Sequence, residues 1–152
     1  MRVARLIGAT VLASFLLLAL AAGIARADER KLIATDLDHL AIRGYDTVAY
    51  FTDSKAIKGS SDFVYIWGDA RWQFATAAHR DMFAADPDRY APQYGGYCAG
   101  SMAMGELSVA NPKKWTIVNG KLYMFAGTGL AGPFNTGEIA AADANWRSRT
   151  QH

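Results

Sequence analysis

Apolar residues after position 27 occur in short runs that polar and glycine-containing segments separate. Two pairs of runs are rich in β-branched and aromatic residues, and a two-residue turn joins the members of each pair, which predicts two β-hairpins. The hairpins comprise residues 63–67 and 71–74 around Gly68-Asp69, and residues 115–118 and 121–125 around Asn119-Gly120. Asn-Gly is a strong hairpin signal because both residues tolerate a positive φ. Another short run, residues 48–51, predicts a further strand.

Apolar residues at helical spacing predict one helix after each hairpin. Thr76 is placed to cap the first helix, and Asp86-Pro87 ends it and can start a further short turn. Its apolar face consists of Ala78, Met82 and Phe83. The second helix is predicted over about residues 138–146.

Asp143 and Arg147 in that second helix are spaced for an i,i+4 ion pair. The four tryptophans of the chain are assigned to packing. No internal repeat is visible, and no linker is long enough to divide the chain. Residues 28–152 are therefore predicted to form a single α+β domain, in which β-hairpins pack with short helices.

The first 27 residues have the order of charge and hydrophobicity that is typical of a secretory signal peptide. Arg2 and Arg5 precede an apolar run over residues 6–24, and Ala25-Arg26-Ala27 offers a small-residue cleavage site. A membrane anchor is the alternative for an apolar run of this length. Polar residues within the run and the cleavage site favour removal, which predicts a Sec-type signal and a protein in the periplasm or secreted. The membrane is then a partner only during export.

Removal of the signal changes the charge of the chain. The full sequence has 16 Lys and Arg against 14 Asp and Glu, and loss of Arg2, Arg5 and Arg26 leaves 13 against 14. A nearly neutral chain without a basic stripe does not predict nucleic-acid binding. The one cysteine, Cys98, cannot form an internal disulfide, so it is expected to be a free thiol, a ligand or an intermolecular partner.

Four parts of the chain carry a recognisable family pattern: residues 44–51, residues 72–75 and 80–90, residues 91–99 and residues 142–146. In these parts the chain resembles exported proteins of the YHS-domain family. The resemblance covers nearly all of the chain after the signal. It implies a small, treble-clef-like metal-binding module of the kind that occurs beside copper- and heavy-metal-transporting ATPases and in some metal-dependent oxygenases.

The resemblance also implies three metal-ligand positions, at which relatives carry cysteines. In this chain they are Ala49, Ala75 and His79. Alanine has no metal-binding atom, so the implied fold can be carried over and the implied metal site cannot.

A different metal site can be built from soft donors. Cys98, Met102 and Met104 lie within seven residues, and thiolate and thioether sulfur suit Cu(I). His79 is a further candidate ligand. The alternative is that the methionines fill the core and that Cys98 is a small buried apolar residue. Copper is therefore the expected cofactor, and zinc is the alternative. If the sulfur atoms only pack in the core, the domain has no cofactor.

Enzymatic activity is not predicted. Cys98 and a histidine could form a nucleophile–base pair, but nothing in the sequence places a histidine beside Cys98. The chain has no phosphate loop, zinc-protease helix or Gly-x-Ser-x-Gly elbow.

A second functional class is a metal-free module that binds a small ligand or another exported protein. Tyrosine and glycine residues in the resembling segments can line such a surface. The candidates are Tyr45, Asp46, Tyr94, Gly95, Gly96 and Tyr97. The alternative for the tyrosines is that their rings build the core and their hydroxyl groups bind backbone atoms. The sequence therefore predicts non-catalytic soft-metal binding or metal handling first and this recognition module second.

Overall fold

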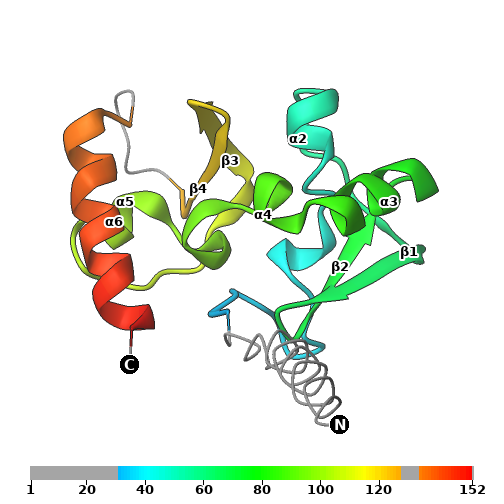
Figure 1. Cartoon of the computed structure of the whole chain (residues 1–152), viewed down its shortest axis with the longest axis horizontal. Helices are drawn as coiled ribbons and strands as arrows, with labels where there is room; N and C mark the ends of the chain where they lie inside the picture. Colours follow the sequence, from blue (N-terminus) through cyan, green and yellow to red (C-terminus); the bar gives the residue numbers. More distant parts are fainter. Residues whose placement is uncertain (1–30, 128–133, 152) are drawn as a thin grey trace, which may run out of the picture.

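The fold is known from a computed structural model, which describes residues 31–127 and 134–151. It is an α+β fold in which two antiparallel hairpins pack with short helices, as predicted (Figure 1). The hairpins are β1 (Ser60–Trp67) with β2 (Ala70–Phe74), and β3 (Asn111–Val118) with β4 (Lys121–Phe125). The helices are η2 (Ile42–Gly44), α2 (Ala49–Thr52), α3 (Ala77–Ala85), α4 (Pro87–Tyr90), η3 (Gln93–Gly96), α5 (Ala99–Ala103) and α6 (Thr136–Thr150).

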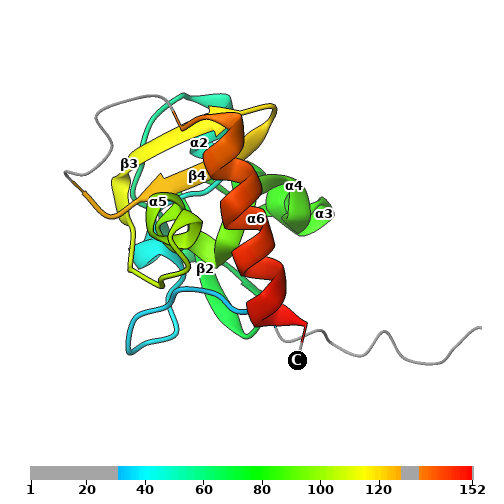
Figure 2. The same ribbon diagram turned by 90° about the vertical axis from the view of Figure 1, so that its left-hand side faces the viewer.

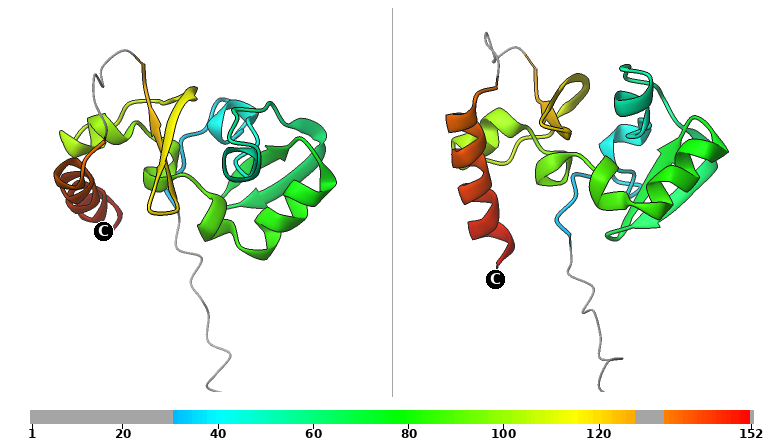
Figure 3. Two further views of the ribbon diagram at one scale, coloured as in Figure 1. Left: turned by 90° about the horizontal axis from the view of Figure 1, so that it is seen from above. Right: turned by 45° about the horizontal axis from the view of Figure 1, so that its top comes forward.

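The β3–β4 hairpin lies in the middle of the molecule. The α5–α6 pair stands on one side of it, and the β1–β2 hairpin with α3 stands on the other (Figures 1 and 3). Side chains of β4 alternate between the two sides, because successive residues of a strand point to opposite faces. Leu122 and Met124 belong to the core cluster that contains Trp72, whereas Tyr123 belongs to the cluster that contains Met102. Strand β4 is thus buried on both faces.

The two hairpins have the same register. In each, an eight-residue strand meets a five-residue strand, and three consecutive residues of the longer strand bulge out of the ladder. Ser60 pairs with Phe74 and Val64 with Gln73, and in the same way Asn111 pairs with Phe125 and Trp115 with Met124. Every pair of the second hairpin lies 51 residues after its counterpart in the first.

The helix caps that the sequence predicts are present. The Thr76 side chain accepts a hydrogen bond from the His79 N–H at the start of α3, and Asp86 accepts one from the Arg89 N–H at the start of α4. Helix α6 is longer than predicted at both ends. At its start, Asn135 and Glu138 form a capping box that begins the helix two residues earlier, and at its end the helix continues to Thr150. Figure 2 shows α6 running along the outside of α5 and the β3–β4 hairpin.

Two local predictions are wrong. Residues 49–51 belong to α2 rather than to a strand, and Val48 is its N-cap. The Asp46 carboxylate accepts hydrogen bonds from the N–H groups of Val48 and Ala49 and so holds the chain in a turn where the helix begins. Asp143 forms no ion pair with Arg147; instead its Oδ1 accepts a hydrogen bond from the Tyr94 hydroxyl at 2.8 Å.

No helix in residues 31–127 and 134–151 combines the length and the hydrophobicity needed to cross a bilayer. The predicted signal peptide lies outside the described residues.

Candidate functional site

A fully buried carboxylate organises the first half of the chain. Asp46 is inaccessible to solvent, and its Oδ1 accepts hydrogen bonds from the N–H groups of Val48 at 2.9 Å and Ala49 at 3.2 Å. Its Oδ2 accepts one from the N–H of Ala75 at 2.8 Å and lies 2.7 Å from Nδ1 of His79. Burial of a carboxylate is costly unless its oxygens are hydrogen-bonded, and here both oxygens have two partners each.

His79 is held by this carboxylate rather than presented as a free ligand. Its side chain is 16% exposed. Its other ring nitrogen, Nε2, lies 3.4 Å from Oγ1 of Thr52 and 3.7 Å from Oδ2 of Asp53. The Asp46 contact fixes the orientation of the ring, in the way that a carboxylate orients a histidine in many protein sites.

The same backbone arrangement recurs around Cys98. Cys98 directly precedes α5, whereas Asp46 lies three residues before α2. Hydrogen bonding from the backbone N–H groups of Gly100, Ser101 and Ala126 lowers the pKa of the Cys98 thiol. Gly100 and Ser101 lie two and three residues after Cys98, and Ala126 directly follows β4. The donors to Asp46 stand two and three residues after it and directly after β2.

The structure therefore contains an internal repeat, which the sequence analysis missed. The backbone N–H of Asp46 donates to Ile57 O and that of Cys98 to Ser108 O, both at 2.8 Å. The repeat extends to the aromatic core, where Phe83 packs on Trp72 and Phe74 as Phe134 packs on Tyr123 and Phe125. Its sequence signal is weak. Gly44-Tyr45 recurs as Gly96-Tyr97 at a spacing of 52 residues, and Phe74-Ala75 and Phe83 recur as Phe125-Ala126 and Phe134 at a spacing of 51.

Cys98 thus takes the place of a buried anion. Burial raises the pKa of the Cys98 thiol, but hydrogen bonding from the Ser101 hydroxyl and from the three backbone N–H groups outweighs burial, and the pKa is lowered overall. The Cys98 side chain makes no capping hydrogen bond at the start of α5. The lowered pKa nevertheless favours the thiolate.

A cavity of about 810 Å³ opens beside the sulfur. Besides Cys98, the described residues that line it include Ser101, Met104, Phe125 and Glu138. Cys98 itself is 6% exposed, so the cavity is its route to a ligand. In the first half, the Asp46 carboxylate has three backbone N–H donors, and the His79 ring is its fourth partner. The residue 51 positions after His79 is Leu130, which has no donor atom and lies outside the described residues.

The predicted metal ligands are not all brought together. Cys98 and Met104 line the same cavity, and Met104 is largely exposed. Met102 is fully buried in a core cluster and is not among the described lining residues. His79 binds Asp46 in the other half of the molecule. In residues 31–127 and 134–151 no three His, Cys, Asp or Glu side chains are grouped to hold a metal.

The predicted tyrosine and glycine surface is largely internal. Asp46, Tyr94 and Gly96 are buried, and Tyr45, Gly95 and Tyr97 are half-buried. The tyrosine hydroxyls serve the fold: that of Tyr94 binds Asp143, and that of the buried Tyr50 donates to the backbone oxygen of Pro112 at 2.8 Å. These residues form no single exposed surface.

The three positions that the family resemblance implies as metal ligands do converge in space. Ala49 and Ala75 direct their N–H groups, and His79 its imidazole, at the Asp46 carboxylate. With a carboxylate at their centre and two alanines among them, these positions cannot hold a metal in the first half. At the equivalent place in the second half, Cys98 offers a soft sulfur ligand instead of a carboxylate.

Comparisons with protein-family models, with curated proteins and with solved structures find no match to this chain.

Proposed function

We propose that this domain binds a soft metal cation, Cu(I), through the Cys98 thiolate, and that it catalyses no reaction. The single observation that carries the proposal is that Cys98 and Met104 line one cavity of about 810 Å³. Hydrogen bonding that lowers the pKa of the Cys98 thiol supports it further, because it favours the thiolate. Thiolate is the form of cysteine that binds metals.

The donor set supports Cu(I) over harder cations. Cys98 offers a thiolate and Met104 a thioether on the same cavity. Soft sulfur donors select Cu(I), whereas carboxylate and carbonyl oxygens suit Mg²⁺ and Ca²⁺. Zinc usually requires four ligands from the protein in a structural site, and the described residues bring two sulfur atoms to the cavity. Cu(I) is therefore the better candidate of the two metals that the sequence predicted.

Anaerobic titration of the reduced, purified protein with Cu(I), in competition with a colorimetric chelator, tests the proposal. We expect about one Cu(I) per chain for the wild type and none for Cys98→Ala. Met104→Leu is expected to weaken binding roughly tenfold, because one soft donor is lost. Met102→Leu is expected to bind as the wild type does. The matched control is Met82→Leu, which alters an exposed methionine on α3. Unchanged binding by Cys98→Ala contradicts the proposal.

A second candidate function is binding of a small organic ligand in the same cavity. Its volume of about 810 Å³ falls in the range of about 300–1,000 Å³ that is usual for small-molecule sites. Retention of such a ligand by Cys98→Ala, together with absent Cu(I) binding, favours this function over metal binding.

The proposed place of action is the periplasm or the exterior of the cell. The support is the order of charge, hydrophobicity and small residues in the first 27 positions. Mass spectrometry of the protein from an exporting host is expected to find Asp28 as the first residue. A chain that retains residues 1–27 contradicts removal of the signal.

A further inference from the structure

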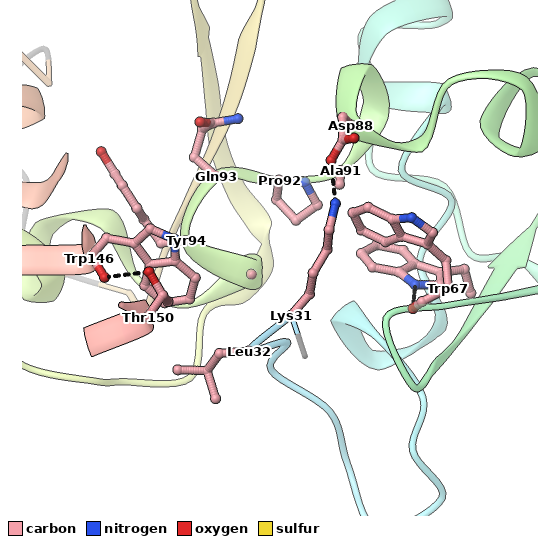
Figure 4. Close-up of a pocket in the computed structure, with 12 residues that line it drawn as sticks. Lys31, Leu32, Trp67, Asp88, Ala91, Pro92, Gln93, Tyr94, Trp146 and Thr150 are labelled. Carbon is pink, nitrogen blue, oxygen red and sulfur yellow. Dashed lines mark hydrogen bonds and ion pairs between the residues drawn. The ribbon is translucent and has the colours of Figure 1, made fainter. Parts of the chain in front are cut away.

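A second, smaller cavity has tryptophan side chains on both of its walls. It measures about 260 Å³ and shares no described lining residue with the cavity at Cys98. Figure 4 shows Trp67 on one side and Trp146 with Tyr94 on the other, with Pro92 between them. Trp67 ends β1, and Trp146 belongs to α6. The cavity therefore lies where the two halves of the molecule face each other.

A cation from the chain itself occupies one side of this cavity. The Nζ of Lys31 lies 4.0 Å from the centroid of the Trp67 ring and 2.5 Å from Oδ1 of Asp88 (Figure 4). An ammonium group over an indole face, with a carboxylate beside it, is the arrangement by which proteins recognise organic cations. The ion pair alone contributes little, because the Asp88 side chain is 79% exposed.

The indole that receives the ammonium is held in place by its own contacts. The Trp67 ring packs on the rings of Trp72 and Phe83, with centroids 5.8 Å and 5.7 Å away. The backbone oxygen of Trp67 also accepts a hydrogen bond from Nε1 of Trp72 at 3.0 Å. None of these contacts involves Lys31, so the aromatic surface is formed without it. A preorganised surface of this kind loses little entropy when a ligand binds.

The Lys31 side chain can leave the site without moving the neighbouring backbone. The segment is fixed three residues later, where the Ala34 N–H donates to Gly95 O at 2.9 Å. The Lys31 side chain is 35% exposed and so has a path to solvent.

We propose that this cavity binds a small organic cation, in which an ammonium group is attached to an apolar body, and that Lys31 is an internal ligand that competes for it. The ammonium of the ligand takes the place of the Lys31 Nζ over Trp67 and beside Asp88. Its apolar body lies toward Trp146 and Tyr94. The site is independent of the proposed metal site at Cys98.

The test is titration of the full protein with methylammonium and tetramethylammonium chloride, followed by NMR of the tryptophan indole N–H groups, with sodium chloride at equal ionic strength as reference. In Lys31→Ala we expect saturable shifts of the Trp67 indole signal. In the wild type the apparent affinity is expected to be at least about tenfold lower, because a competitor that is bound nine-tenths of the time leaves a tenth of the sites free. Lys55→Ala, which removes an exposed lysine elsewhere, is the matched control and is expected to behave as the wild type.

Two further variants in the Lys31→Ala background locate the site. Trp67→Leu is expected to abolish saturable binding. Asp88→Asn, which changes an exposed residue outside the core, is expected to weaken binding several-fold without loss of folding. Shifts in Lys31→Ala that match those with sodium chloride overturn the proposal. So does saturable binding that survives both substitutions.

Discussion

The Nδ1 atom of His79 lies 2.7 Å from Oδ2 of Asp46 and completes a set of four donors around a carboxylate that solvent does not reach. The other three donors are backbone N–H groups, two at the start of α2 and one directly after β2. Asp46 thus connects a helix, a hairpin and the start of α3. This makes His79 a structural partner of Asp46 in the first half of the molecule.

Asp46→Asn is expected to destabilise the protein by about 3 kcal/mol. The substitution places an NH₂ group opposite the Ala75 N–H and the His79 ring, and it leaves buried donors without an acceptor. Urea unfolding at neutral pH measures the loss. The control is Asp53→Asn, since Asp53 is exposed and lies 3.7 Å from the other ring nitrogen of His79; its effect is expected within about 0.5 kcal/mol. Equal effects of the two substitutions contradict the structural role of Asp46.

The internal repeat predicts that the Cys98 cradle accepts a carboxylate. Cys98→Asp is expected to cost about 1–2 kcal/mol, because N–H groups already face this position. The neighbouring Ala99 is fully buried in an apolar core cluster. Ala99→Asp is therefore expected to cost more than about 4 kcal/mol or to prevent folding. Thermal and urea unfolding compare the two, and a larger loss for Cys98→Asp than for Ala99→Asp rejects the equivalence of Asp46 and Cys98.

Gly95 tests a close approach between distant segments. Its φ is +61°, and a Cβ atom on it lies 1.9 Å from the backbone oxygen of Leu32. Gly95→Ala is expected to destabilise the protein by about 3 kcal/mol. The alanine must adopt a strained φ, and the backbone at Leu32 must also move to make room for its Cβ atom. Gly120 separates the two causes, because it has a φ of +74° and open space around it. Gly120→Ala is expected to cost about 1 kcal/mol. Similar losses at both positions in urea unfolding show that steric contact with Leu32 is unimportant.

The local parts of the fold could be predicted from the sequence. Both hairpins follow from β-branched and aromatic runs around short turns, and the Thr76 and Asp86 caps follow from residue type and spacing. The helix at residues 49–52 could not be predicted in this way. It depends on hydrogen bonds that the Asp46 carboxylate forms, and these override the strand preference of the run.

The candidate site was predictable only in part. Cys98 and Met104 are neighbours in sequence and line one cavity, but the pairing of Cys98 with Ala126 joins segments 28 residues apart. The internal repeat explains this pairing, but few residues are identical between the two halves. Their backbones are similar, whereas most of the side chains at equivalent positions differ. A carboxylate in one cradle and a thiol in the other conceal the equivalence at the level of sequence.

Tyr94 predicts how stability falls at alkaline pH. Burial raises the pKa of Tyr94, and the hydrogen bond to Asp143 and the charge of that carboxylate raise it further. In the unfolded chain tyrosine has a pKa of about 10. The stabilisation is therefore complete below about pH 10 and is lost as the pH rises toward the folded pKa, by about 1.4 kcal/mol per pH unit for each such group. Burial also raises the pKa of Tyr50, so this residue contributes to the same loss of stability at alkaline pH.

Tyr94→Phe removes one of these groups. It is expected to cost about 1–2 kcal/mol at neutral pH through the lost hydrogen bond to Asp143, and to make the decline above pH 10 less steep than in the wild type. Urea unfolding between pH 7 and pH 11 measures both effects. Parallel stability curves for the two proteins at alkaline pH contradict the raised pKa, because they show that Tyr94 titrates alike in the folded and unfolded states.

Ser101 predicts the pH dependence of Cys98 reactivity. The pKa of Cys98 is lowered because hydrogen bonding, with the Ser101 hydroxyl as the largest favourable contribution, outweighs the effect of burial. The rate of alkylation by iodoacetamide follows the thiolate fraction, so its midpoint is expected below that of free cysteine, although burial lowers the absolute rate. Ser101→Ala is expected to move the midpoint to higher pH and to slow alkylation at neutral pH about threefold to tenfold. Ser61→Ala, on the exposed start of β1, is expected to change neither. If Ser101→Ala leaves the midpoint in place, the hydroxyl does not stabilise the thiolate, and the backbone N–H groups alone must account for the lowered pKa.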